Sequence, residues 1–266
     1  MSVTIEKQNK SILQDFVRII EQDKRKEIPV IKFIRHGFLE ELTKRFSANK
    51  KKVNFVGITG ESASGKSTFV KTLTKKIQEI EADKNKSILN FISTDNYFND
   101  ISDKIKKYGS FDNYLIEENY NPDAPTSFQL ELMRKHLETL SEGKSVNIPE
   151  YKVDGTGISV KNAIQIDAAP IIISEGIAVL YPAVRDMFDI RFYVEVDEEI
   201  RIERYIKRAI ANRNQTELDA LMQYERINKS AKIHLRPQRK YADIIINGNA
   251  NIADIEDIAE KVIRCF

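Results

Sequence analysis

The sequence predicts an α/β fold with a doubly wound, mostly parallel sheet, helices on both faces and an N-terminal helical extension. Two observations support this fold class. The apolar run 53–59 passes through a glycine-rich turn into a helix-type pattern over residues 66–81, which is a strand–loop–helix unit. Residues 169–176 form a continuous apolar run that ends in an acid, as expected of a parallel strand buried on both faces.

The composition is that of a globular protein with a sizeable core. The chain has 266 residues, of which 41% are hydrophobic and 31% charged. Cys265 is the only cysteine and the three histidines lie far apart, so we expect no intramolecular disulfide and no zinc cluster. The chain shows no hydrophobic signal core and no apolar run of the ~18–20 residues that span a membrane. We therefore expect a cytoplasmic protein without membrane contact.

Residues 1–49 are predicted to form the helical extension, and residues 50–266 the main domain. Apolar residues share helical faces before and after Pro29: Ile12, Phe16, Ile19, Ile20, Phe38, Leu39, Leu42 and Phe46. Packing on the main domain, or on a sister subunit in a homo-oligomer, is favoured over a separate binding module. Residues 1–52 carry a net charge of +6, which a solvated helical surface explains, so we expect no nucleic-acid partner.

The glycine-rich turn fills the phosphate-loop pattern G-x-x-x-x-G-K-[ST] between a strand and a helix, where that motif belongs. Gly60 and Gly65 permit backbone angles that let successive N–H groups converge on a phosphate. Lys66 can reach the β- and γ-phosphates, and the Ser67 hydroxyl can bind Mg²⁺. The pattern predicts nucleoside triphosphate binding by Gly60, Ser62, Ala63, Ser64, Gly65, Lys66, Ser67 and Thr68.

The second strand is expected over residues 87–93 and is followed by Asp95. Ligand groups gather at the carboxyl ends of parallel strands, so Asp95 should lie near the phosphate loop if the two strands are close. Its carboxylate could accept the proton of an attacking hydroxyl or hold a water on Mg²⁺. It could also cap a helix, and the two roles are compatible.

Residues 99–128 are rich in Asp, Asn, Tyr and Pro and are predicted to form a loop that is either mobile or functional. A helix over about 127–142 and a strand over 146–151 follow, and then a glycine turn at 154–157. This strand and turn are consistent with an ordinary hairpin or with a substrate flap.

Glu175 ends the buried strand and is placed to support Mg²⁺ through water. A strand over 190–196 leads into a helix with several cations on neighbouring turns, which are Arg201, Arg204, Lys207, Arg208 and Arg213. We favour a lid that covers the transferring phosphates over a plain basic surface. A last strand over 242–247 and an amphipathic helix over 252–265 complete the expected elements.

These residues resemble the uridine kinase and phosphoribulokinase family of phosphate-loop kinases. The resemblance covers about residues 53–264 and rests on Gly57 to Thr68, Thr94-Asp95-Asn96-Tyr97, Asn121-Pro122-Asp123-Ala124, residues 143–151, Ser174-Glu175-Gly176-Ile177, the segment from Arg185 through the arginine helix, and residues 240–246. It implies a P-loop kinase fold that uses ATP and Mg²⁺.

The resemblance also implies residue roles. Lys66, Arg208 and Arg213 handle phosphate charge, Asp95 is the base, and Ser67, Asp95 and Glu175 form the magnesium site. Tyr97 and Tyr151 would line the acceptor pocket, and Arg204 and Asn121 would also contact substrate.

Three departures concern pyrimidine recognition. Asn121 stands near the place of a ribose-binding aspartate, Val153 replaces a stacking ring, and no histidine follows the pocket tyrosine. Gln215 replaces a further lid arginine.

The resemblance predicts a kinase that transfers the γ-phosphoryl group of MgATP to a hydroxyl of a small molecule. Uridine or cytidine is the leading acceptor, and another sugar or a pantothenate-like alcohol is the alternative. A regulatory NTPase and a non-catalytic nucleotide-binding module are the rivals. The guanine-reading N-K-x-D pattern is absent, since Asn85-Lys86 continues as Ser87-Ile88, which argues against a GTPase.

Overall fold

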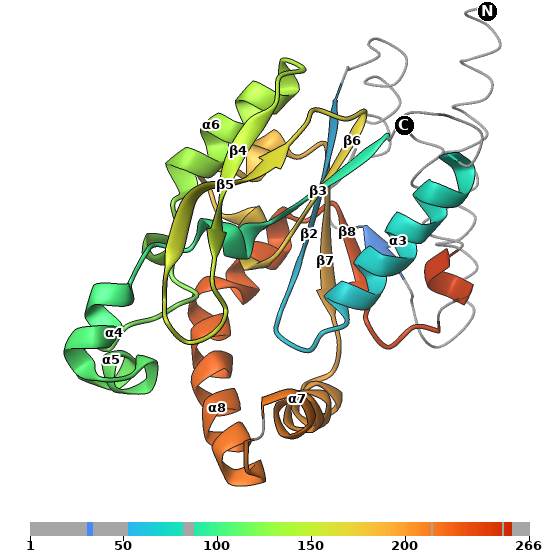
Figure 1. Cartoon of the computed structure of the whole chain (residues 1–266). Coiled ribbons are helices and arrows are strands. Elements are labelled where there is room, and N and C mark those ends of the chain that lie inside the picture. The colour runs from blue at the N-terminus through green and yellow to red at the C-terminus, as the bar shows by residue number, and fades with distance from the viewer. Residues whose placement is uncertain (1–30, 34–52, 82–87, 214, 252, 257–266) are drawn as a thin grey trace, which may run out of the picture.

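A computed structural model describes residues 31–33, 53–81, 88–213, 215–251 and 253–256 (Figure 1). Within this part of the chain, a six-stranded sheet has the order β1-β8-β7-β2-β6-β3. Neighbouring strands are parallel, except that β1 runs antiparallel to β8. The strands are β1 Ile31–Phe33, β2 Asn54–Gly60, β3 Leu89–Ser93, β6 Ile171–Glu175, β7 Ile190–Glu195 and β8 Ile244–Asn247. A separate antiparallel hairpin comprises β4 Val146–Tyr151 and β5 Ser159–Ile166.

Helices cover both faces of the sheet. The α-helices are α3 Lys66–Glu81, α4 Ser102–Tyr108, α5 Phe111–Glu117, α6 Leu130–Ser141, α7 Glu198–Arg213 and α8 Glu217–His234. The 3₁₀ turns are η1 Thr94–Tyr97, η2 Pro125–Ser127, η3 Ile177–Leu180, η4 Arg185–Met187 and η5 Arg236–Tyr241. α3 packs on one face, whereas α6 and the end of α8 pack on the other. The predicted doubly wound α/β fold class is confirmed.

The central strand β2 is mostly apolar because both of its faces are buried. Side chains alternate across a strand, so Val56 and Ile58 pack with α3, while Phe55 packs with α6 on the opposite face. On α3, Phe69 and Leu73 lie one helical turn apart and are each 1% exposed. Burying such a side chain contributes about 1.5–3 kcal/mol. This packing holds the start of α3 directly behind the loop that follows β2.

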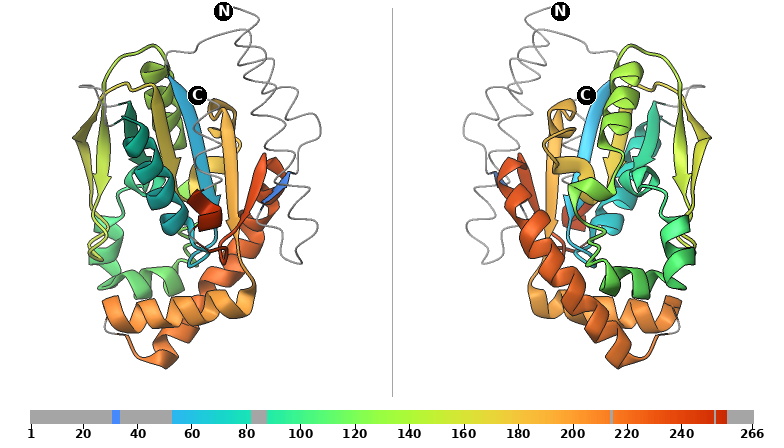
Figure 2. Two further views of the ribbon diagram at one scale, coloured as in Figure 1. Left: turned by 90° about the vertical axis from the view of Figure 1, so that its right-hand side faces the viewer. Right: turned by 90° about the vertical axis from the view of Figure 1, so that its left-hand side faces the viewer.

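The carboxyl ends of the parallel strands gather the chain segments that form the site. β2 ends in the glycine-rich loop, β3 runs into η1, and β7 leads into α7. The helix pairs α4–α5 and α7–α8 lie at this same end of the sheet (Figures 1 and 2). The fold therefore places two helical pairs around the edge at which ligands of open α/β sheets bind.

The segment 99–128 differs from the predicted loop because it contains α4 and α5. Both helices are only seven residues long and depend on local caps. Gly109 ends α4 in the left-handed region, and the Ser110 side chain accepts a hydrogen bond from the Asn113 N–H (3.1 Å) at the start of α5. Short helices of this kind have too few residues for a clear periodic pattern, which is why the sequence did not predict them.

Helix α8 was not predicted either. Its buried residues include Ala220, Tyr224, Asn228 and Ala231, which are small or polar and do not form an apolar stripe. Thr216 caps the helix by accepting a hydrogen bond from the Asp219 N–H (3.2 Å). The helix is recognisable only once its partner α7 is in place, since Tyr205 and Tyr224 pack edge to face at 5.5 Å.

The N-terminal segment contributes β1 to the edge of the sheet, in a stretch for which only helices were predicted. The apolar stripes assigned to residues 1–49 lie outside the described residues, and the boundary between residues 49 and 50 stays a prediction. Of the closing helix, the structure describes residues 253–256, where Ile255 is buried. Across the described helices, none combines the length and the apolar character that crossing a membrane requires.

Candidate active site

The phosphate loop connects β2 to α3 in a conformation that depends on glycine. Gly60 has a φ of 152° and Gly65 a φ of 101°, and a Cβ on Gly60 would collide with the Val194 carbonyl. The Ser64 N–H donates to the Glu61 carbonyl (3.1 Å), which tightens the loop. A cavity of about 390 Å³ lies over it and is lined by Ser62–Thr68, Arg204, Arg208, Gly248, Ala250 and Ile255. All the residues predicted to bind nucleotide, apart from Gly60 at the base of the loop, line this phosphate-loop cavity.

Lys66 stands at the start of α3, and its ammonium donates a hydrogen bond to the Glu61 carbonyl (3.3 Å). Desolvation lowers its pKa, while the carboxylates of Glu175 and Asp95 act in the opposite direction. The lysine is therefore a cation that faces two acids across the end of the sheet.

The sheet register explains how Glu175 and Asp95 reach that position. β6 lies between β2 and β3, with Glu175 opposite Ile58 on one side and Ser93 on the other. On β2, the residue paired with Glu175 lies two positions before Gly60. On β3, the residue paired with Glu175 lies two positions before Asp95. The expected proximity of Asp95 to the phosphate loop is mediated by β6, because β2 and β3 are not adjacent.

Both acids have perturbed ionisation. Desolvation raises the pKa of Asp95, although Lys66 acts to lower it, and Asp123 raises it further. Desolvation likewise raises the pKa of Glu175, again opposed by Lys66. Ser93 rather than Asp95 caps η1, because the Asp95 N–H donates to the Ser93 hydroxyl (3.3 Å). The Asp95 carboxylate has no capping role there.

The residues around Glu175 suit a magnesium ion. Glu175 Oε2 is buried and has no hydrogen-bond partner among the described residues, and Ser67 is exposed at the start of α3. Mg²⁺ prefers such oxygen ligands and usually completes its shell with water and substrate phosphate. The described residues contain no group of three or more His, Cys, Asp or Glu that would form a protein cage. The donor set therefore fits a metal held jointly by the protein and a nucleotide.

The arginines of α7 lie on the nucleotide side. Arg208 donates to the Ser62 hydroxyl (2.9 Å), and Arg204 donates to the Gly248 carbonyl (3.0 Å) and to Asn249 Oδ1 (2.9 Å). Both line the phosphate-loop cavity, as a lid would require. Arg204, which was assigned to the acceptor, thus contacts the wall of the nucleotide cavity instead. Arg213 is the last residue of α7, and its side chain lies outside the described part of the structure.

Tyr151 lies close to Asp95 at the end of β4. Desolvation raises its pKa to about 12, and Tyr120, Asp100, Asp154 and Asp95 all add to the shift. Its ring centroid lies 5.1 Å from that of Phe98. Tyr151 is therefore near enough to Asp95 for the two groups to interact electrostatically, and its place in the acceptor pocket stays a prediction.

Tyr97 requires a correction. The side chain is 0% exposed, and its hydroxyl forms a 3.0 Å hydrogen bond with His136 Nδ1. It packs in the core against α6, because residues three apart share a face of a 3₁₀ turn and η1 buries both Thr94 and Tyr97. The neighbouring Phe98, and not Tyr97, carries the ring that contacts Tyr151.

Asn121 and Asp123 occupy the loop before η2. Asn121 Oδ1 accepts hydrogen bonds from the Asp123 N–H (3.0 Å) and the Ser230 hydroxyl, so this oxygen already holds the loop against α8. Asp123 was quoted in the sequence without a role, yet it faces the site. Desolvation raises its pKa, and His234 and Lys66 act to lower it. Only its proximity to a proline turn marked it in the sequence.

The hairpin β4–β5 is tied to α4. The Ile101 N–H donates to the Gly157 carbonyl and the Ser159 N–H donates to Asp100 Oδ2, both at 2.9 Å. The pairing is that of an ordinary antiparallel hairpin with one register shift. The hairpin contributes Tyr151 to the site, whereas Val153 in its turn is 85% exposed.

Comparison with known proteins identifies the family of this chain. A model of the phosphoribulokinase/uridine kinase family matches residues 55–253. A uridine kinase of Halobacterium salinarum is 31% identical over 78% of this chain and 85% of that protein, and one of Clostridium novyi is 33% identical over 78% and 93%. Phosphoribulokinase from Rhodobacter spheroides shares the fold, with a TM-score of 0.51 at 15% identity over 73% of this chain and 70% of that one. The resemblance read from the motifs is confirmed, and this chain belongs to the phosphoribulokinase/uridine kinase family.

Proposed function

We propose that the protein is a kinase that transfers the γ-phosphoryl group of MgATP to a hydroxyl of a small molecule, with uridine or cytidine as the first acceptors to test. The observation that carries this proposal is the convergence of Lys66, Asp95 and Glu175 at the phosphate loop. A nucleotide-binding module without catalysis would have no need for a base and a metal-supporting acid at this point.

Each residue has a role in the proposed transfer. The loop N–H groups and Lys66 hold the β- and γ-phosphates, and Arg208 neutralises charge from the lid side. Asp95 accepts the proton of the acceptor hydroxyl, whose oxygen bonds to the γ-phosphorus while the bond to the departing ADP oxygen breaks. Ser67 and Glu175 would hold Mg²⁺, with Asp95 as a further oxygen group nearby. When bound, the ion neutralises phosphate charge.

The raised pKa of Asp95 suits a general base. A base is most effective when its pKa lies closer to the working pH than an ordinary aspartate does, provided that it stays ionised. Lys66 supplies that balance, because its positive charge favours the ionised form of Asp95 while the surrounding protein disfavours it.

The residues near Asp95 give more support to an acceptor with a hydroxyl group than to specific recognition of a pyrimidine base. Relatives named uridine kinase support uridine. However, Asn121 Oδ1 is engaged by α8 and the side chain of Val153 is largely exposed, so neither residue supplies the contact that the family pattern suggests. We therefore propose that uridine is bound with little discrimination against related nucleosides, sugars or pantothenate-like alcohols.

The test is kcat/KM, read as ADP formation, for uridine, cytidine, a purine nucleoside, several sugars and pantothenate under one set of conditions. We expect turnover with a nucleoside and discrimination well below a thousandfold. A preference for uridine and cytidine of about a thousandfold or more, which hydrogen-bond readout can reach, would contradict weak discrimination. ADP formation that no acceptor accelerates would instead favour the regulatory NTPase.

A further inference from the structure

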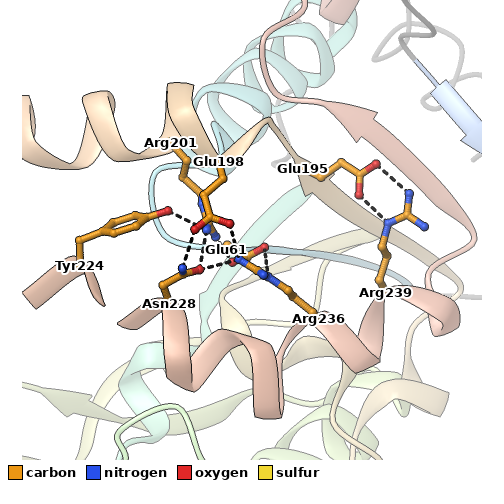
Figure 3. A network of polar contacts seen from close by, with 8 residues as sticks. All are labelled: Glu61, Glu195, Glu198, Arg201, Tyr224, Asn228, Arg236 and Arg239. Carbon is orange, nitrogen blue, oxygen red and sulfur yellow. Dashed lines mark hydrogen bonds and ion pairs between the residues drawn. The ribbon is translucent and has the colours of Figure 1, made fainter. Parts of the chain in front are cut away.

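The phosphate loop carries one acidic side chain, Glu61, that the proposed transfer does not use. Its carboxylate is clamped between two arginines (Figure 3): Oε1 accepts from Arg236 Nε at 3.1 Å, and Oε2 is ion-paired with Arg201. The Glu61 side chain is 15% exposed and Arg201 3%. The cluster is thus largely shielded from water, where ion pairs are screened much less than on the surface.

The two arginines are held by a second set of contacts. Asn228 Oδ1 accepts hydrogen bonds from Arg201 (2.8 Å) and from Arg236. Glu198 accepts from Asn228 Nδ2 (2.6 Å) and pairs with Arg236 at 3.4 Å. Figure 3 shows these side chains converging from the phosphate loop, α7, α8 and η5. The phosphate loop is therefore joined to α7 and η5 through the Glu61 carboxylate, and α8 joins the same network through Asn228.

The same residue also shapes the loop through its main chain. The Glu61 carbonyl accepts hydrogen bonds from the Ser64 N–H (3.1 Å) and from the Lys66 ammonium (3.3 Å). The next residue, Ser62, accepts a hydrogen bond from Arg208 of α7. The side chain of Glu61 thus fixes a backbone position on which the two phosphate-binding cations, Lys66 and Arg208, both depend.

We propose that Glu61 is a positioning residue, which locks the phosphate loop to α7 so that Lys66 and Arg208 face the same nucleotide phosphates. The inference rests on the proposed function, since it assumes that MgATP occupies the phosphate-loop cavity. A contact of this kind affects catalysis by geometry: displacement of a reacting group by about 1 Å can cost roughly a hundredfold in rate.

The chain offers a matched control in the same region. Glu195 forms a two-point ion pair with Arg239 (2.5 and 2.7 Å) and lines the same 470 Å³ cavity as Glu61; among the described residues its carboxylate bonds to η5 and not to the phosphate loop. Glu195→Gln therefore removes one carboxylate charge from an arginine pair in the same cavity, although Glu195 is more exposed than Glu61 (40% against 15%). This variant measures how the loss of a nearby ion pair changes ATP kinetics and stability when the phosphate loop is not displaced.

The experiment compares Glu61→Gln with Glu195→Gln. We expect Glu61→Gln to lower kcat/KM for ATP by about ten- to hundredfold, with KM for the acceptor unchanged, and Glu195→Gln to stay within about twofold of the wild type. The shift in melting temperature on adding MgATP should shrink in Glu61→Gln alone. Glu61→Asp, which keeps the charge, should recover part of the loss. A purely structural ion pair would lower the stability of both variants and leave ATP kinetics unchanged.

A second variant keeps the inference testable if Glu61→Gln does not fold. Arg236→Gln removes one of the two cations, and Arg236 is 32% exposed, so the protein should tolerate it. We expect a smaller loss in kcat/KM for ATP, and a loss in the double variant no greater than in Glu61→Gln, because coupled residues are not additive. Wild-type ATP kinetics in the folded variants would overturn the inference. If MgATP stabilises the wild-type protein but no acceptor is phosphorylated, the proposed function is overturned. The role of Glu61 is then tested by the MgATP-induced shift in melting temperature of Glu61→Gln and Glu195→Gln.

Discussion

The nucleotide side and the acceptor side of the site are built in different ways. On the nucleotide side, one continuous segment, residues 62–68, supplies most of the cavity lining, and Arg204 and Arg208 of α7 complete it together with Gly248, Ala250 and Ile255. On the acceptor side, Asp95, Asp123 and Tyr151 come from three separate segments. The comparison teaches that binding residues within one local motif can be identified individually from the sequence. Binding residues that come from distant segments cannot.

The outcomes for the predicted residues follow this division. Lys66, Ser67 and Arg208 line the cavity over the phosphate loop, and their roles towards nucleotide stay predictions. Among the acceptor residues, Tyr151 lies near Asp95, but Tyr97 is in the core and Arg204 is on the nucleotide side. The predictions below test whether the two sides are functionally as separate as they are structurally.

The largest effect is expected on the nucleotide side, from Lys66→Ala. Loss of the ammonium removes the cation that holds phosphate charge, so phosphoryl transfer should be abolished. The fold should persist, because the side chain is not part of either core cluster. Circular dichroism and ADP formation measure the two outcomes. Lys71→Ala, on the exposed face of the same helix, is the matched control and should keep wild-type turnover; near-wild-type turnover of Lys66→Ala would refute the phosphate-loop assignment.

Asp95→Asn should have the next largest effect and should separate the two sides. A general base contributes about 10²–10⁴-fold, so turnover should fall by about a hundredfold or more. ATP affinity should change little, since Asp95 lies beyond Glu175 from the loop. Kinetics and MgATP titration measure both quantities, with the exposed Asp103→Asn as control. An equal loss of ATP binding would assign Asp95 to the metal or to the nucleotide.

The pH dependence sharpens the role of Asp95 further. Its pKa is raised, so the base becomes protonated, and inactive, at a higher pH than an ordinary aspartate of pKa about 3.9. We expect kcat/KM for ATP to fall about tenfold per pH unit below the pKa of Asp95, with this acid limb above the usual aspartate range. The lowered pKa of Lys66 brings the alkaline limb below that of an ordinary lysine. An acid limb at the ordinary aspartate value would contradict the desolvated site.

The smallest effects distinguish the two tyrosines that the sequence assigned to the acceptor pocket. Tyr151→Phe should raise KM for the acceptor by about two- to tenfold, the scale of one hydrogen bond, without changing stability much. Tyr97→Phe should instead affect stability and not KM. It leaves His136 without its partner and should lower the free energy of unfolding by about 1–3 kcal/mol, with KM unchanged. Denaturant unfolding and acceptor kinetics check the pair, and a raised KM for Tyr97→Phe would return that residue to the pocket.

Several features could be predicted from the sequence because each depends on neighbouring residues. The pattern from Gly60 to Thr68 determined a phosphate loop, and α3 begins and ends at the predicted residues, Lys66 and Glu81. The apolar runs predicted the five parallel strands β2, β3, β6, β7 and β8 to within about two residues, but not the antiparallel edge strand β1. The acid at the end of β6 was visible as a candidate metal ligand for the same reason, since strand ends are local features.

The tertiary structure decided the rest through contacts between distant residues. It inserted β6 between β2 and β3, which puts Glu175 between the loop and Asp95. It buried Tyr97 against His136, and it paired Glu61 with Arg201 and Arg236, which lie 140 and 175 positions further along the chain. No periodicity or motif marks such pairs, because an ion pair depends on which segments the fold brings together and a short sequence pattern does not record that.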